Sequence, residues 1–386
     1  MTLHSTTEVA KKVVIGASIG IGSIVLIVVL FRVGVFFKDV LFPPKIDSAN
    51  EAYGKIPELV FPQSTIKRNL TYTIDTLNGS LPTDFPDRLI IYPMVVKTPS
   101  LLDLQTIKRR VQTLGFFDAS GNLVPEIPRG GASYEWDETT GLQRKIIYDI
   151  VTQNFILTSN YLTSLTVLNA QNLGDETTAF DRVQGLLGSI DSYPDDIDST
   201  LTKNPSPDMD YVTKPQLFAI VNGVLQPTTS LSNAQVIRVD LYQKEIDYSL
   251  TAGQGKELTH FQNFDMKLPI LYPHPPHSTI HFFVASGSNG SDVVDGSYTH
   301  QTINLKPDQQ ATYPIKTPTE AFDDLKNGRG YVAAYNGTSN QILINKVYLA
   351  YYLGEKIQQY LMPIIVFEGQ DGFFAYVSAV QDSALN

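Results

Sequence analysis

The stretch Val13–Phe37, VVIGASIGIGSIVLIVVLFRVGVFF, decides how the rest of the chain is organised. It contains no charged residue between Val13 and Phe31, and roughly 19 residues at about 1.5 Å each span about 28 Å, the thickness of a bilayer's hydrocarbon core. Arg32 would then lie at the interface, with its guanidinium reaching water. A buried helix of a globular core is rarely apolar on every face over this length. We therefore predict a transmembrane helix over 13–37.

A cleaved signal peptide is the alternative reading of this segment. Its apolar region would be about 7–15 residues long and would end at small residues. Here the run is longer, and bulky residues follow it in LFRVGVFFKDVLFPP, 30–44. We expect the helix to remain as a single anchor in the lipid bilayer, preceded by a polar tail over 1–12. Basic residues flank both ends of the helix, so local charge does not decide its orientation.

Small residues share one face of the predicted membrane helix. Gly16 and Gly20 form a G-x-x-x-G pattern, which in lipid lets two helix backbones approach closely, and Ser23 extends this face. We expect the face to pair with a helix of another membrane protein or of a second copy of this chain, a homodimer. The alternative is that small residues are simply common in membrane helices.

The remaining composition is that of an acidic folded protein. The chain has 386 residues, a formal charge of −10 and 42% hydrophobic residues, which is enough for a core and too apolar for disorder. No Lys/Arg cluster is dense enough to neutralise phosphates, and KRR at 108–110 is expected to be the solvated face of a helix. Nucleic acid is therefore not an expected partner. The absence of cysteine excludes disulfides and thiol chemistry.

Proline-rich stretches divide the chain after the helix. Several prolines between 38 and 65 predict a semi-extended stalk that lifts the following domain off the membrane. The stretch 203–216 holds three prolines and no apolar period, and we interpret it as a linker. We therefore predict a first α+β domain over 66–202 and a second over 217–386.

Local patterns predict the elements of these domains. Apolar residues at helical spacing predict a helix at 101–114, another at about 177–190 and a short one in TPTEAFDDLKNG, 317–328. The segments 133–136 and 142–160 are separated by turn residues and predict a hairpin. Strands cluster around one or two helices in each half, which favours an α+β fold with antiparallel sheets.

Each predicted domain contains an apolar strand that ends in Tyr-Pro. These strands are LIIYP at 89–93 and PILYP at 269–273, and in both halves a helix and then a hairpin follow. The shared order predicts a duplication that is visible in the topology rather than in sequence identity.

Two clusters contain residue types that could bind a metal ion. His274, His277 and His281 lie at spacings that zinc could use, but two prolines stiffen the loop and no nearby Cys or Glu completes the set. The run DSYPDDIDST, 191–200, is rich in carboxylates but lacks the spacing, turn glycine and closing Glu of an EF-hand. We expect a solvated acidic loop there, and no metal or other cofactor.

Catalytic motifs are absent from the sequence. It contains no Walker loop, no H-E-x-x-H and no dinucleotide-binding fingerprint. Ser64 and Lys67 form S-x-x-K, but the partner motifs of a serine acyl-enzyme are missing. We therefore predict that the protein is not an enzyme.

The C-terminal strands carry a resemblance to a known family. The runs concerned are ATYPIKTPTEAFDDLKNGRGYVAAY (311–335), NKVYLAYYLGEK (345–356) and YLMPIIVFEGQDGFFAYVSAV (360–380). Together they resemble the YycH and YycI family, and DIVTQNFILTSNYL (149–162) is similar to the PepSY-like hairpins of the same family. These motifs are structural, since VYLAYY (347–352) is a strand apolar on both faces and EGQDG is a hairpin loop.

Members of that family are single-pass extracytoplasmic proteins of Gram-positive bacteria that regulate a cell-wall sensor histidine kinase. The resemblance implies a cell-membrane protein with its N-terminus inside, residues 46–386 outside the cytoplasm, and two PepSY-like domains. It also implies a regulatory binding protein that contacts a membrane partner through its helix and ectodomain. The alternative is a structural cell-envelope protein that binds wall or surface components without signalling.

Overall fold

The computed structural model describes residues 49–169, 173–200, 214–247, 267–287 and 290–386. These residues belong to one compact unit, 49–386. The predicted tail and membrane helix, with Gly16, Gly20 and Ser23, lie outside the described residues. Among the helices inside the ranges above, none is long and apolar enough to cross a membrane.

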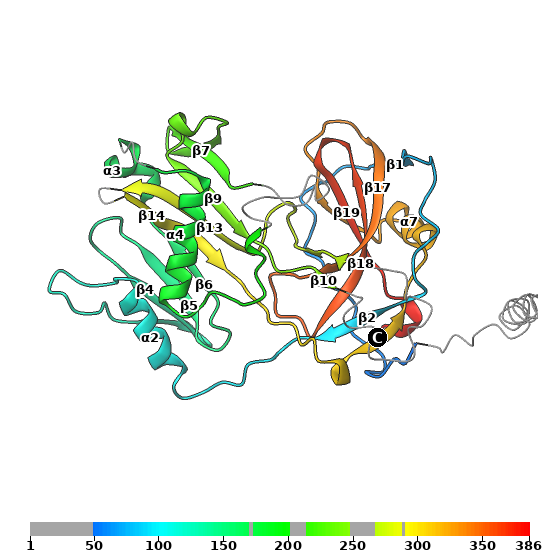
Figure 1. The fold of residues 1–386 in the computed structure, drawn as a ribbon, viewed down its shortest axis with the longest axis horizontal. Helices are drawn as coiled ribbons and strands as arrows, with labels where there is room; N and C mark the ends of the chain where they lie inside the picture. The colour runs from blue at the N-terminus through cyan, green and yellow to red at the C-terminus, as the bar shows by residue number, and fades with distance from the viewer. Residues whose placement is uncertain (1–48, 170–172, 201–213, 248–266, 288–289) are drawn as a thin grey trace, which may run out of the picture. The chain divides into compact units, whose positions relative to one another are not determined.

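The larger sheet has nine strands in the order β3-β4-β5-β6-β14-β13-β9-β7-β8 (Figure 1). Every neighbouring pair in it is antiparallel. Its strands are β3 (Ile127–Gly130), β4 (Ser133–Asp137), β5 (Lys145–Asp149), β6 (Phe155–Thr158), β7 (Gln216–Val221), β8 (Val224–Pro227), β9 (Val236–Leu241), β13 (Ile280–Gly287) and β14 (Gly290–Tyr298). The predicted hairpin over 133–160 is confirmed as β4, β5 and β6.

The second sheet has eight strands, five of which follow the order β1-β17-β18-β19-β16. Strand β2 pairs with β15 and β18, and β12 pairs with β17; β1 and β12 run parallel to β17, and the other pairs are antiparallel. Its strands are β1 (Thr71–Ile74), β2 (Arg88–Pro93), β12 (Ile270–Leu271), β15 (Ala311–Pro314), β16 (Tyr331–Ala334), β17 (Gln341–Tyr352), β18 (Tyr360–Gly369) and β19 (Phe373–Ser378). A separate two-stranded ladder joins β10 (Ile246–Asp247) to β11 (Lys267–Leu268).

Few helices accompany these sheets, as the α+β prediction requires. They are α2 (Asp103–Thr113), α3 (Leu165–Leu168), α4 (Glu176–Ser189), α7 (Pro318–Lys326) and the short 3-10 turns η1 (Tyr161–Thr163), η2 (Leu231–Asn233), η4 (Pro307–Gln309), η5 (Gln370–Gly372) and η6 (Asp382–Ala384). The three predicted helices are confirmed. Local capping explains their starts: Asp175 accepts a hydrogen bond from the Thr178 amide, and Thr317 and Glu320 form a capping box at α7.

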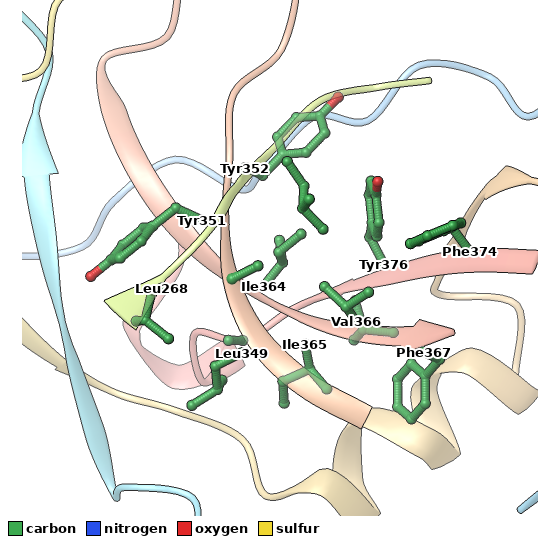
Figure 2. Packing of buried hydrophobic residues seen from close by; sticks show 14 of the residues in the cluster. Leu268, Leu349, Tyr351, Tyr352, Ile364, Ile365, Val366, Phe367, Phe374 and Tyr376 are labelled. Carbon is green, nitrogen blue, oxygen red and sulfur yellow. The ribbon is translucent and has the colours of Figure 1, made fainter. Parts of the chain in front are cut away.

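Each sheet buries its own apolar cluster. Helices α2 and α4 cover one face of the nine-stranded sheet, where Trp136 and Phe180 are buried; Figure 1 shows α4 lying across β9, β13 and β14. In the eight-stranded sheet, alternate residues of β18 point to opposite sides, and Figure 2 shows Ile364 and Val366 on one side with Ile365 and Phe367 on the other. The strand predicted to be apolar on both faces, 347–352, lies in β17, and within 347–352 every residue but Tyr348 is buried, so this prediction is confirmed.

The two sheets do not divide the chain as the predicted domains do. The nine-stranded sheet combines β3–β6 from the first predicted domain with strands from the second, and the eight-stranded sheet takes β1 and β2 from the first. The two Tyr-Pro strands, 89–93 and 269–273, both contribute to the eight-stranded sheet, through β2 and β12. Local patterns predicted the strands but not their long-range partners. Most of the predicted linker, 203–213, lies outside the described residues.

The described part of the predicted stalk, 49–65, is packed against the eight-stranded sheet rather than standing free. Ile56 is fully buried and forms a parallel bridge with Leu385. Tyr53 stacks on Tyr360 at a ring distance of 4.9 Å, and the Phe61 ring lies 4.9 Å from that of Tyr352. Proline correctly indicated an extended backbone, but the apolar side chains between the prolines find partners on the sheet. This segment therefore differs from the predicted spacer.

Candidate functional site

A cleft of about 280 Å³ lies where loops of the two sheets meet. The segment after β2 (94–97), the β5–β6 loop (151–154) and the loop after α4 (191–194) form three of its walls. The end of β14 with the residues after it, 298–302, and the β17–β18 loop complete it. We call it the inter-sheet cleft. It is close to the lower size limit of small-molecule sites, and polar side chains converge on it, so it is the candidate site.

Another groove is larger, about 660 Å³, and lies between the segment Pro57–Gln63 and the residues 352–362. Its walls are mainly apolar and include the N-terminal segment that packs against the sheet. The inter-sheet cleft is the stronger candidate because charged side chains meet there.

One wall of the cleft brings two cations to a single amide oxygen. Arg110 on α2 donates to Oε1 of Gln153 at 3.0 Å and to the backbone carbonyl of Asp191 at 3.0 Å. Lys97 donates to the same Oε1 at 3.3 Å and to the carbonyl of Thr152 at 3.2 Å. Partial burial, followed by the charge of Arg110, lowers the pKa of Lys97, which Asp103 only partly offsets.

The opposite wall carries an imidazole–carboxylate pair. Nε2 of His300 lies 2.9 Å from Oδ1 of Asp196, and Nε2 of Gln243 donates to Oδ2 of Asp196 at 2.7 Å. Burial alone would raise the pKa of Asp196, but the hydrogen bond and charge of His300 and the amide of Gln243 outweigh burial and lower it. The backbone amide of His300 donates to Asn154, which also lines the cleft. This pair therefore fixes the end of β14 against two loops.

Buried tyrosines form the floor beside these charged groups. Burial raises the pKa of Tyr298 well above its usual value, and the charge of Asp196 adds to this while Arg110 opposes it. Burial, with a contribution from Asp198, also raises the pKa of Tyr193. The Tyr193 hydroxyl is buried and has no hydrogen-bond partner among the described residues. Both phenols therefore stay neutral.

Gln301 links the cleft to the β17–β18 loop of the other sheet. Its side-chain Nε2 donates to the carbonyl of Gly354 at 2.9 Å and to that of Lys356 at 3.1 Å, and its Oε1 accepts from the amide of Gln358 at 2.8 Å. Its backbone carbonyl accepts from Gln243, the partner of Asp196. A continuous chain of hydrogen bonds thus connects the imidazole–carboxylate pair to the second sheet.

We expect Gln301→Leu to lower the free energy of unfolding by about 1–3 kcal/mol, because it leaves buried backbone groups of the β17–β18 loop without partners. Urea unfolding followed by circular dichroism measures this loss. Gln359→Leu is the matched control, since Gln359 is exposed in the same loop region, and its effect should stay within about 0.5 kcal/mol. Equal effects of both substitutions would contradict the assigned role of Gln301.

The predicted candidate residues occupy different places from those expected. The acidic loop is solvated at Asp195, but Asp196 is partly buried and paired, so the prediction of a wholly solvated loop is wrong. Within KRR, Arg109 is exposed as expected, whereas Arg110 reaches the cleft wall. Asp196 has the same residue type as its neighbour Asp195, and Arg110 the same as Arg109. The sequence therefore does not distinguish them, and only the fold determines which of the two side chains turns inward.

The three histidines do not converge. His281 has its Nδ1 3.3 Å from the carbonyl of Ser278, and burial lowers its pKa to about 4. His277 lies 3.7 Å from the buried Asp240, while His274 lies at 4.0 Å from Glu355. Over the described ranges, no three or more His, Cys, Asp or Glu side chains gather closely enough to hold a metal ion.

Sequence reasoning missed the residues that build the cleft. Lys97, Gln153, His300 and Gln301 belong to no recognisable motif, and they come together from three segments that are far apart in the sequence. One weak signal is present: Gln153 and Asp191 both have positive φ angles, 64° and 52°, and both hold Arg110. Such backbone conformations in non-glycine residues cluster at functional sites.

Comparisons with known proteins give one distant structural similarity and no family. No family model matches this chain, and no curated protein matches its sequence. Among solved structures it is similar to an uncharacterized protein from Eubacterium rectale ATCC 33656, at 8% identity and a TM-score of 0.28, over 77% of this chain and 84% of that one.

Proposed function

We propose that this protein is a membrane-anchored extracytoplasmic binding protein that regulates a membrane partner by protein–protein contact, without catalysis of its own. The observation that carries the proposal is the inter-sheet cleft, whose walls come from both sheets and are joined by the Asp196–Gln243–Gln301 chain of hydrogen bonds. A molecule bound there would touch both sheets at once. Its binding would therefore favour one arrangement of the loops around the cleft.

The order of elements in each sheet supports a PepSY-like architecture within this proposal. Helix α2 is followed along the chain by β3–β6, and α7 is followed by β16–β19, so a helix precedes four antiparallel strands in both sheets. The spatial order of the four strands differs between the sheets. In a regulatory protein of this kind, the partner would be a membrane protein such as a sensor kinase, reached through the predicted helix and the ectodomain.

The topology is tested by adding protease to intact spheroplasts that express the full chain. We expect residues 46–386 to be degraded, because the predicted helix over 13–37 would leave them outside. An N-terminal epitope and a cytoplasmic marker protein should both survive. Protection of the C-terminal region under these conditions would contradict the proposed localisation.

Photo-crosslinking separates the regulatory proposal from the structural alternative. A crosslinker is placed at Val96 or Ile357, which are 73% and 67% exposed at the rim of the cleft. Val224 on the edge strand β8 is the control, since it is also exposed but does not line the cleft. A rim-specific adduct with a membrane signalling protein would support regulation. Adducts with wall or surface components would favour the structural alternative.

A further inference from the structure

We infer that the inter-sheet cleft binds a small organic anion, a carboxylate attached to an apolar body, at the wall where Lys97 and Arg110 share the amide oxygen of Gln153. This inference deepens the proposed function because it names the chemical class of the ligand. It rests on the cleft being a binding site, and its test needs no membrane partner.

Two like charges meet in this wall, and the charge of Asp103 balances that of Lys97 only in part. Lys97 and Arg110 share the neutral Oε1 of Gln153, and their other acceptors are backbone carbonyls. Among the described residues, neither side chain has a carboxylate within ion-pair distance. Mutual repulsion disfavours this arrangement, and an anion bound beside both cations would remove the repulsion. Lys97 and Arg110 thus place two positive charges at a wall that also includes Asp191, on a chain whose net charge is −10.

The donors that remain suit a planar carboxylate. A guanidinium has five N–H groups and an ammonium has three, and the described contacts occupy two of each. Arginine pairs with carboxylates through two parallel hydrogen bonds, which gives geometric selectivity. Tyr193 belongs to the same lining, but its hydroxyl is buried, so its ring would have to turn before the hydroxyl could donate to the anion.

The rest of the lining is largely apolar, so it favours an anion that carries an apolar group. Met94, Val95, Val96, Val151 and Ile357 all line the cleft, and Val95, Val96 and Ile357 are exposed. Covering these side chains with an apolar group would remove their surface from water, which is favourable. The volume of about 280 Å³ limits the ligand to a small molecule.

Backbone strain at the site shows that the position of Arg110 is held by the fold. Gln153 and Asp191, its two acceptors, adopt φ angles of 64° and 52°, which non-glycine residues rarely adopt. Asp149 fixes the first of these turns, because its Oδ1 accepts from the amides of Val151 and Thr152 at 3.0 and 2.8 Å. The guanidinium is therefore oriented before any ligand arrives, which reduces the cost of binding.

The test is calorimetric titration of the full chain in detergent with phenylacetate, phenylacetamide and inorganic phosphate. Phenylacetate carries a carboxylate on an apolar ring, and phenylacetamide has the same shape without charge. We expect phenylacetate to bind at least about tenfold more tightly than phenylacetamide, since its carboxylate accepts charge-assisted hydrogen bonds and the neutral amide does not. Equal binding of the two, or no measurable binding of phenylacetate, would overturn the inference. Tighter binding of inorganic phosphate would overturn the assignment of a carboxylate.

Substitutions locate the site within the chain. Lys97→Gln and Arg110→Gln should each weaken phenylacetate binding by about tenfold or more. Arg109→Gln is the matched control on the same helix, because Arg109 is exposed and does not touch the cleft residues. Lys97 is exposed, so its substitution remains informative even if Arg110→Gln fails to fold. Unchanged affinity in Lys97→Gln would place the anion elsewhere.

Gln153→Glu provides an independent arm, because it places a carboxylate where Lys97 and Arg110 already meet. We expect it to raise the melting temperature and to weaken phenylacetate binding at least about tenfold, since the site then contains its own anion. Gln143→Glu is the control, another exposed-loop glutamine with positive φ, 50°. A Gln153→Glu protein that melts lower and binds phenylacetate unchanged would contradict the inference. If the unsubstituted chain fails to bind phenylacetate but still forms the rim-specific crosslink with a membrane signalling protein, the ligand class is rejected and the proposed function stands.

Discussion

Phe367→Ala is expected to lower the free energy of unfolding by about 3–5 kcal/mol, which is the usual cost of emptying a buried phenylalanine site. Phe367 lies on β18, is fully buried, and packs its ring 5.9 Å from that of Phe322 on α7 (Figure 2). Its strand neighbours Val347 and Ala375 are also buried, so little can move in to fill the cavity. Urea unfolding of the full chain, followed by circular dichroism, measures the loss.

Two further substitutions make this prediction specific. Phe367→Leu keeps most of the side-chain volume, so it should lower the free energy of unfolding clearly less than Phe367→Ala does. Ile357→Ala removes an apolar side chain that is 67% exposed, and its effect should stay within about 0.5 kcal/mol. If Phe367→Ala cost no more than Ile357→Ala, the eight-stranded sheet would not be packed as described.

Asp240→Asn is expected to lower the free energy of unfolding by about 3–5 kcal/mol. It removes the negative charge of a buried ion pair and leaves the positive charge of Arg238 uncompensated. Both oxygens of Asp240 accept from Arg238, at 2.8 and 3.0 Å, and Oδ1 also accepts from the amide of Ser278 at 2.8 Å. Arg238 is itself largely buried. Asp292→Asn, an exposed position in the same sheet, is the control and should have little effect.

The same carboxylate predicts a pH dependence. Burial alone would raise the pKa of Asp240, but His277, 3.7 Å away, and the paired Arg238 lower it to about 2. An aspartate in the unfolded chain titrates near about 3.9, so the folded state holds its proton less tightly. The group therefore contributes roughly 2–3 kcal/mol of stability above about pH 4, and this contribution is lost as the pH falls to about 2.

Unfolding measurements across this range test the sign. The difference in stability between the native chain and Asp240→Asn should be largest near neutral pH and should shrink between about pH 4 and about pH 2. A difference that stays constant or grows on acidification would show that the Asp240 carboxylate is not the stabilised form.

Elements that depend on near neighbours were predictable. Helical spacing at 101–114 anticipated α2, whose buried Ile107 and Val111 lie on one face, and the segment 317–328 anticipated α7. The ends were less well determined: α2 begins at Asp103, because Leu101 and Leu102 stay exposed instead of joining the core. An apolar residue indicates where a helix can pack, but only its tertiary neighbours decide whether it does.

The composition of each sheet could not be predicted. Strand β6 pairs with β14, so Phe155 lies opposite Tyr298 although more than a hundred residues separate them. Alternation within each strand was visible, but an alternating strand is compatible with many partners. The predicted division into domains at 203–216 followed the order of the chain, whereas strand pairing crosses that position in both sheets.

The sequence by itself determined the α+β class, the three helices, the β4–β6 hairpin and the doubly apolar C-terminal strands, because each depends on residues within a few positions of one another. The anchor over 13–37 stays a prediction of the same local kind. Only the tertiary structure brought Arg110 to Gln153 and His300 to Asp196, and packed 49–65 onto a sheet. A cleft forms only where side chains from distant segments converge. Their directions depend on long-range strand pairing, which local sequence patterns do not predict.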